Sequence, residues 1–251
     1  MNEQKLKKIE DYVKDHENVS LTTLCSEFNI SMSTLRRAVA VLCERGVINK
    51  RYGCVYATSK RKFIPFHLRA NLNTEAKRET CRIAAQLIKE DDIIYLDSGS
   101  TTCYILDYIG HLNNVTIITG NIDIIVKALS MDNVTVFVLP GLLNKKNNSF
   151  TPTNAKEAFA SYNITKAFIA ASGVSLSNGF SHSDPLERET KLAAIQKSET
   201  ICFVLDDSKF GHTSLISLGP LTLADIICSN KAPDSAIQNY CQEHHIILKY
   251  S

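Results

Sequence analysis

The spacing of hydrophobic residues divides this chain into two parts. In the first part, apolar residues recur every three or four positions in three stretches, which is the period of an amphipathic helix. Their stripes are Leu6, Ile9 and Val13; Leu21, Leu24 and Phe28; and Leu35, Val39 and Leu42. Ser20 and Ser31 stand just before the second and third stretches, where a helix N-cap is expected. The pattern predicts three short helices, the last two separated by a tight turn at Asn29-Ile30.

A short hairpin is predicted after the third helix, in the segment GVINKRYGCVY at residues 46–56. Gly46 ends the helix, and Val47-Ile48 and Val55-Tyr56 are predicted strands on either side of a turn at 50–53. Three helices followed by a β-hairpin make a winged helix-turn-helix. The sequence therefore predicts a first domain of this type over residues 1–57.

The third helix begins with small hydroxyl side chains and carries two arginines, which is typical of a helix that reads DNA. Small side chains allow close approach to the base edges, and arginines reach guanine or phosphate. The candidate DNA-binding residues are Ser31, Ser33, Thr34, Arg36 and Arg37, with Lys50 and Arg51 at the tip of the wing. An ordinary helical hairpin with solvated arginines has the same pattern, so this segment alone leaves both interpretations open.

From Thr74 the pattern changes to one amphipathic helix followed by short apolar strands that alternate with helical stretches. Strands are predicted at 93–96, 115–119, 134–139, 166–171, 201–205, 225–228 and 245–249. This alternation predicts an α/β domain with a mainly parallel sheet covered by helices on both faces. Residues 58–72, with a basic cluster and no clear period, are the predicted linker, and residues 73–251 are the predicted second domain.

The charge distribution supports two domains with different partners. The formal net charge is only +2, but residues 1–62 hold 12 Lys/Arg and 7 Asp/Glu, whereas the remainder holds 16 Lys/Arg and 19 Asp/Glu. A basic small domain joined to a mildly acidic larger one fits a nucleic-acid reader attached to a second function. An uneven surface without a partner is common, so the asymmetry adds weight without deciding the question.

Composition also restricts the setting in which the protein works. The polar start, MNEQKLKKIE, does not resemble a signal peptide, and no apolar run approaches the length that spans a membrane. The eight cysteines show no CxxC pair and several lie inside apolar runs. We expect reduced, mostly buried thiols of a cytoplasmic protein, with no disulfide framework, no metal site and no cofactor.

Three predicted strand ends carry polar residues, and ligands of parallel α/β sheets bind at such ends. At the first, LDSGSTTCYIL, a strand ends at Asp97 and a glycine-containing turn leads into a helix, which favours a phosphate or another anion. A simple well-capped helix is the alternative. The candidate effector-binding residues are Asp97, Ser98, Gly99, Ser100, Thr101 and Thr102, joined by Asn121 after the second strand and Lys209 after the fifth.

These motifs together resemble a known family. The segment STLRRAVAVLCERGVINKRYG, then DSGSTT, SGVSLSNGF and DDSKFG in this order, is similar to the DeoR/GlpR family of bacterial transcriptional regulators. The resemblance extends from about Lys5 to Cys228. It implies a repressor of sugar-utilisation genes that binds operator DNA. It also implies a C-terminal domain that is similar to ribose-5-phosphate isomerase and senses a phosphorylated sugar.

The chain departs from the family pattern at three places. Ala38 replaces an acid that would steady the arginines or meet the DNA, and Tyr52-Gly53-Cys54-Val55 stands where the family has H-G-G-A in its wing. Ser172-Gly173 stands where the family has D-G. An isomerase would need a general base there, so Ser172 favours sensing over turnover.

Three functions are compatible with these features. The leading hypothesis is a DNA-binding repressor whose operator affinity is set by a sugar phosphate. The alternatives are a sugar-phosphate isomerase-like enzyme with an appended winged helix and a winged-helix module that binds proteins. The basic stretches at Lys50-Arg51 and 60–62 favour DNA. Because symmetric repressors bind two half-sites, we expect a homo-oligomer, either a dimer or a tetramer.

Overall fold

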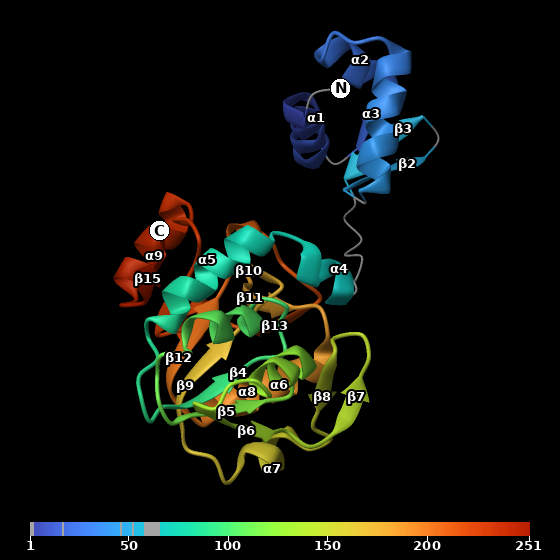
Figure 1. Ribbon diagram of the computed structural model, residues 1–251. Coiled ribbons are helices and arrows are strands. Elements are labelled where there is room, and N and C mark those ends of the chain that lie inside the picture. The colour runs from blue at the N-terminus through green and yellow to red at the C-terminus, as the bar shows by residue number, and fades with distance from the viewer. Residues whose placement is uncertain (1–2, 17, 46, 52, 58–65) are drawn as a thin grey trace. The chain divides into compact units, whose positions relative to one another are not determined.

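The computed structural model describes residues 3–16, 18–45, 47–51, 53–57 and 66–251. The chain divides into two compact units, Met1–Phe63 and Ile64–Ser251 (Figure 1). Each unit has its own hydrophobic core, and each is described separately below.

The first unit is a winged helix, as predicted. Its elements are α1 (Glu3–Asp15), β1 (Asn18–Ser20), α2 (Leu21–Glu27), α3 (Met32–Glu44), β2 (Ile48–Arg51) and β3 (Cys54–Ala57). The strands form an antiparallel sheet in the order β1-β3-β2. The sequence pattern did not predict β1, which is three residues long and adds an edge to the predicted hairpin. Gly46 and Tyr52, to which the sequence assigned a helix end and a wing position, lie outside the described residues.

The predicted caps and apolar stripes hold this unit together. The Ser20 hydroxyl accepts the Thr23 amide at 3.0 Å, and the Ser31 hydroxyl accepts the Thr34 amide at 3.3 Å, so each serine begins its helix. The core is formed by the three stripes together with Ala38, Val19, Ile48 and Val55. Ala38, which stands where the family pattern has an acid, is 2% exposed and belongs to this core.

The second unit is built on a seven-stranded sheet in which all six neighbouring pairs are parallel. The strand order is β15-β14-β12-β9-β4-β5-β6. The strands are β4 (Ile93–Leu96), β5 (Val115–Thr119), β6 (Val134–Val138), β9 (Ile164–Ile169), β12 (Ser198–Val204), β14 (Ile226–Cys228) and β15 (Ile247–Lys249). They correspond to the seven predicted strands, which confirms the α/β fold class.

Helices cover both faces of this sheet because alternate strand residues face opposite sides. Ile94 and Leu96 of β4 pack with α5 (Thr74–Ala85), the 3₁₀ helix η1 (Thr102–Tyr108) and α6 (Ile122–Ala128). Tyr95 packs on the other face, with α7 (Ala155–Phe159), α8 (Pro185–Gln196) and α9 (Ser235–Glu243). The central strands therefore have no solvated face, which explains their continuous apolar runs.

Three features of this unit escaped the sequence pattern. A hairpin forms from β7 (Leu142–Asn144) and β8 (Ser149–Thr151), and a small antiparallel sheet forms from β10 (Gly173–Ser175), β11 (Gly179–His182) and β13 (Ile216–Gly219). Part of the predicted linker is a helix, α4 (Phe66–Asn71), which belongs to the second unit. Residues 58–65 of that predicted linker lie outside the described residues.

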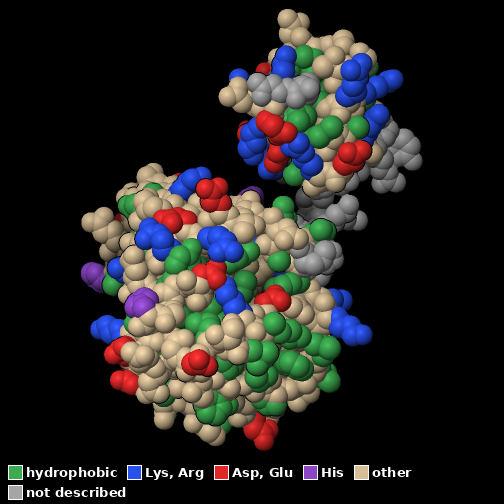
Figure 2. All heavy atoms as spheres, in the orientation of Figure 1, with side chains coloured by type: hydrophobic (Ala, Val, Ile, Leu, Met, Phe, Trp, Pro, Cys, Tyr) green, Lys and Arg blue, Asp and Glu red, His purple; other side chains and the backbone are tan. Residues whose placement is uncertain are grey.

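The described residues also show where apolar side chains are exposed and how the cysteines are placed. Exposed hydrophobic side chains gather over β6 and β7, including Phe137, Val138, Leu142 and Leu143 (Figure 2). All eight cysteines are free, and no cluster of three or more potential metal ligands occurs among the described residues. None of the helices described is long and apolar enough to cross a membrane.

Candidate DNA-binding surface and effector site

The exposed face of α3 carries the predicted DNA-binding side chains. Arg36 and Arg37 are exposed, and neither forms an ion pair with a described residue. Ser31 and Ser33 are also exposed, and their hydroxyls are 3.0 Å apart at the start of the helix. The opposite face, with Leu35 at 0% exposure, is buried. The helix therefore presents to solvent two small hydroxyl side chains and two guanidinium groups that form no ion pair within the described part of the chain.

Of the two basic side chains predicted at the wing, the structure describes that of Lys50. Lys50 is exposed on β2, opposite Val55 of β3. Arg51 pairs through its backbone with Cys54, and its side chain lies outside the described residues. Gly53 at the turn has φ of +79°, a conformation that favours glycine.

The predicted phosphate loop follows β4 and is buried at the carboxyl edge of the sheet. Ser98, Ser100 and Thr101 are 8%, 6% and 5% exposed. The Thr102 hydroxyl donates to the Asp97 carbonyl at 2.6 Å and so holds the turn closed. Gly99 is required here, because a Cβ at this position would lie 2.5 Å from that of Ala170.

Asn121 lies against the same loop, from the end of β5. Its side-chain nitrogen donates to the Gly99 carbonyl at 3.3 Å, and its side-chain oxygen accepts the Asp123 amide at 2.9 Å, which begins α6. The structure thus brings Asn121 and the loop together, and the amide fixes the path of the loop while capping the next helix.

A buried lysine that the sequence analysis missed also meets the loop. Lys77 of α5 is 3% exposed, and its ammonium donates to the Ser100 hydroxyl at 3.2 Å and to the Arg69 carbonyl of α4. Burial, with a smaller contribution from the charge of Lys209, lowers the pKa of Lys77 to about 8. Lys77 therefore lies against the loop, and Lys209 is close enough to Lys77 for the two charges to interact.

Lys209 belongs to the η2 turn (Asp207–Lys209) after β12. Its ammonium lies 3.6 Å from the Asp206 carboxylate, which is fully buried and also accepts the Asn73 side-chain amide at 3.3 Å. One carboxylate oxygen of Asp206 has no hydrogen-bond partner among the described residues. Asn73 immediately precedes α5, so the third predicted strand end lies beside the helix that carries Lys77.

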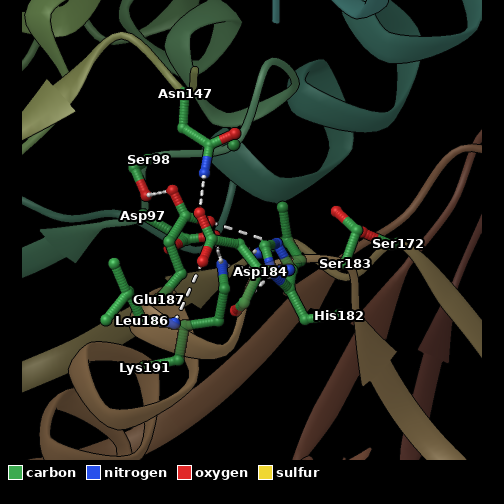
Figure 3. A network of polar contacts seen from close by, with 12 residues as sticks. Asp97, Ser98, Asn147, Ser172, His182, Ser183, Asp184, Leu186, Glu187 and Lys191 are labelled. Carbon is green, nitrogen blue, oxygen red and sulfur yellow. Dashed lines mark hydrogen bonds and ion pairs between the residues drawn. The ribbon is translucent and has the colours of Figure 1, made fainter. Parts of the chain in front are cut away.

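Behind the loop lies a buried network of four ionisable side chains (Figure 3). The Lys191 ammonium pairs with Asp97 and donates to the Ala170 carbonyl at 3.1 Å. Glu187, one helical turn earlier on α8, accepts from the Ser98 hydroxyl at 2.9 Å and lies 3.2 Å from His182 Nε2. The Asp184 amide donates to His182 Nδ1 at 3.2 Å, which is consistent with a proton on Nε2 that is donated to Glu187.

Burial sets the protonation of this network. It raises the pKa of Glu187 to about 7, against the opposing charge of Lys191. Burial and the charge of Lys191 also lower the pKa of His182 well below its usual value, so the imidazole is neutral near pH 7. The network therefore contains a neutral imidazole and a carboxyl group that titrates near neutrality.

Ser172 lies outside this network, beside Ser183, with 3.4 Å between the two hydroxyls (Figure 3). The sequence predicted that an acid is missing at this place in the fold. Ser172 indeed supplies none, but Glu187 brings a buried carboxyl to the loop from another element. The sequence argument against a general base was therefore incomplete.

The missed residues do leave a trace in the sequence. Lys77 occupies the helical stripe of Thr80, Cys81 and Ala84, so it is a charge on an otherwise buried face. Glu187 and Lys191 are likewise four residues apart on the buried face of α8. A charged residue at core spacing needs a partner, and this requirement could have identified both sites before the structure.

A winged helix with exposed arginines, joined to a parallel α/β domain with polar strand ends, is the architecture of a DNA-binding regulator with a sensing domain. Comparison with known families agrees. Residues 5–61 match the DeoR-like helix-turn-helix domain, and residues 72–231 match the DeoR C terminal sensor domain. The chain belongs to the DeoR family of transcriptional regulators.

Curated relatives match nearly the whole chain. The regulator IolR of Bacillus subtilis is 34% identical over 98% of both chains, and the glycerol-3-phosphate regulon repressor of Escherichia coli is 23% identical over 95% of both. A ribose 5-phosphate isomerase of Methanocaldococcus jannaschii matches with 17% identity, 55% of each chain covered and a TM-score of 0.40. The prediction of a transcriptional regulator is confirmed, and the isomerase alternative is not favoured because the full-length relatives are regulators.

Proposed function

We propose that this protein represses sugar-utilisation genes and that a phosphorylated sugar bound in the second unit controls its affinity for operator DNA. The phosphate lies over residues 98–102, at the carboxyl ends of β4 and β5. Lys209 and Lys77 supply the positive charge, and Asn121 fixes the loop. The sugar extends from the phosphate toward other polar groups at this edge of the sheet.

The observation that carries this proposal is the buried Lys77 ammonium. It touches the Ser100 hydroxyl and lies close enough to Lys209 for the second charge to lower its pKa. The like charges of Lys77 and Lys209 repel each other, and a dianion bound near both would offset that repulsion. If Lys209 were only a solvated turn residue and the loop only a helix cap, the burial of the Lys77 ammonium would have no explanation.

The names of the relatives support a small polyol or sugar ligand without fixing which one. They include a glycerol-3-phosphate regulon repressor and an L-fucose operon activator, of Haemophilus influenzae, that is 26% identical to this chain. We propose that the protein represses transcription, and we expect the ligand to release it from operator DNA. A ligand that tightens operator binding would reverse that assignment.

We propose that DNA is bound by at least two copies of the chain. One copy presents a single recognition helix, α3, with Arg36 and Arg37 as its principal contacts. One such helix reads only a few base pairs, and symmetric half-sites supply the remaining specificity. A dimer or tetramer in which the winged helices occupy successive half-sites meets this need.

Calorimetry with matched pairs of phosphorylated and free sugars tests the site. Sugar phosphates are expected to bind wild-type protein, and free sugars are not. Thr101→Asp introduces a carboxylate into the anion site and is expected to abolish binding, whereas Thr101→Ser is expected to retain it. A thermal-shift screen identifies the sugar, because a ligand at 100 times its Kd stabilises the fold by about 2.7 kcal/mol. Equal binding of free sugars and their phosphates would overturn the proposal.

A further inference from the structure

Helix α4 is the first described element of the second unit, and the chain from the winged helix reaches the effector domain through it. It is short, Phe66–Asn71, and is held to the rest of the domain at a few points. The Phe66 side chain is 7% exposed, and the Phe66 amide donates to the Lys146 carbonyl at 3.3 Å. Arg69 donates to the Asn147 side chain at 2.9 Å.

The last turn of α4 is also connected to the effector loop, through hydrogen bonds from the Nζ atom of Lys77. The Lys77 ammonium donates to the Arg69 carbonyl and to the Ser100 hydroxyl. The Arg69 carbonyl also accepts the Leu72 amide at 3.2 Å, so Lys77 binds the point where α4 ends. An ammonium has three donors, and these two contacts leave the third for a ligand at the loop.

We propose that Lys77 couples occupancy of the phosphate site to the docking of α4, and that this coupling is how the ligand reaches the DNA-binding unit. The inference rests on the proposed phosphate site. A bound phosphate attracts the ammonium and favours its charged form, which strengthens its bond to the Arg69 carbonyl. The ligand thereby fixes the position at which the connecting chain leaves the domain.

Thermodynamic linkage gives this proposal a reciprocal consequence. If phosphate stabilises docked α4, then docked α4 must stabilise bound phosphate by the same factor. A substitution that loosens α4 far from the loop therefore weakens phosphate binding, although it touches no ligand. Phe66 is suited to this test because it is buried and uncharged, and Leu68 on the same helix is its control at 50% exposure.

Inorganic phosphate is the probe in the first experiment, with chloride at equal ionic strength as its reference. Hydrogen exchange of the full-length protein is expected to slow over residues 66–72 when phosphate is added. The slowing is expected to disappear in Lys77→Gln, measured at a phosphate concentration that saturates that variant. Exchange over residues 66–72 that stays unchanged or becomes faster in the wild type would overturn the coupling.

The second experiment measures the affinity for phosphate. Phe66→Ala is expected to weaken binding about 5-fold or more, and Leu68→Ala less than about 2-fold, for a coupling in the usual allosteric range. Equal affinities of the two variants would overturn the coupling even if Phe66→Ala lowered the melting temperature. If phosphate bound wild-type protein no better than Thr101→Asp, the phosphate site itself would be wrong, and the coupling would fail with it.

Discussion

The cationic side chains of the two units are held in opposite ways. Arg36 and Arg37 of the winged helix are exposed and form no ion pair with a described residue, whereas Lys77 and Lys191 of the sensor unit are almost fully buried and hydrogen-bonded. A guanidinium that must follow a DNA groove gains from being solvated and mobile. An ammonium that must recognise a small anion gains from being fixed, because its position is then part of the recognition.

The largest effect that tests this difference is on stability. Lys191→Met leaves the Asp97 carboxylate buried without its counter-ion, so we expect a loss of about 3–5 kcal/mol in the free energy of unfolding. Denaturant unfolding measures this loss. Lys156→Met, at an exposed lysine, is the control and should change stability by less than about 0.5 kcal/mol. A small loss in Lys191→Met would mean that the buried cation is not fixed by its pair.

For the winged helix the expected effect is on DNA binding alone. Arg36→Ala or Arg37→Ala should cost on the order of 1–3 kcal/mol of operator affinity if the arginine contacts a base. Neither should change stability by more than about 0.5 kcal/mol. Lys14→Ala on α1 removes the same charge and is the control in gel-shift titrations. Unchanged operator affinity in both arginine variants would exclude α3 as the helix that contacts the bases.

The response to the ligand also distinguishes the lysines of the sensor unit from the arginines of the winged helix. Lys209→Ala should bind operator normally and fail to release it when the sugar phosphate is added, because Lys209 lies in the sensor unit and not on the DNA-binding helix. The response lost corresponds to a coupling of about 1–3 kcal/mol, or about 5- to 150-fold in operator affinity. Lys231→Ala, at an exposed lysine near the same edge, should respond like wild type. A Lys209→Ala protein that still releases DNA would exclude this lysine from the site.

The smallest effect is a pH dependence of ligand binding. Lys77 binds an anion in its charged form, and its pKa is lowered to about 8 by burial. Affinity for a sugar phosphate should therefore be close to its full value at pH 7 and fall as the pH rises through about 8, by about tenfold at pH 9. Calorimetry at pH 7 and pH 9 measures the fall. Lys77→Gln should bind weakly at both values, and a wild-type affinity that does not change would contradict the assignment.

The regular parts of the fold could be predicted because burial there follows a period. All seven strands of the parallel sheet are apolar runs, and both serine caps precede clear helical stripes. Strands β7, β8 and β10 are three residues each, too short to show alternation, and β11 pairs with β13, a segment distant in the sequence. Helix α4 was not predicted because contacts with residues 146 and 147, which are distant in the sequence, hold it in place.

The residues of the candidate effector site could be predicted only where they follow strand ends. Asp97, Asn121 and Lys209 stand in such places, and the structure brings the first two to one loop. Lys77 and Glu187 come from helices and His182 from the end of β11, and the loop residues that Lys77 and Glu187 contact are distant in the sequence. Their roles depend on tertiary contacts, which hydrophobic periodicity does not encode.

The strand order has a consequence for how the chain folds as it is synthesised. Strand β4 pairs with β9, so residue 94 must wait for residue 166 before the centre of the sheet can form. The winged helix closes its own sheet within residues 18–57. Local contacts form faster than distant ones, and domains fold as they emerge from the ribosome. The DNA-reading unit is therefore complete while the sensor is still an open chain with unpaired apolar strands, and that interval is when the nascent protein is most exposed to aggregation.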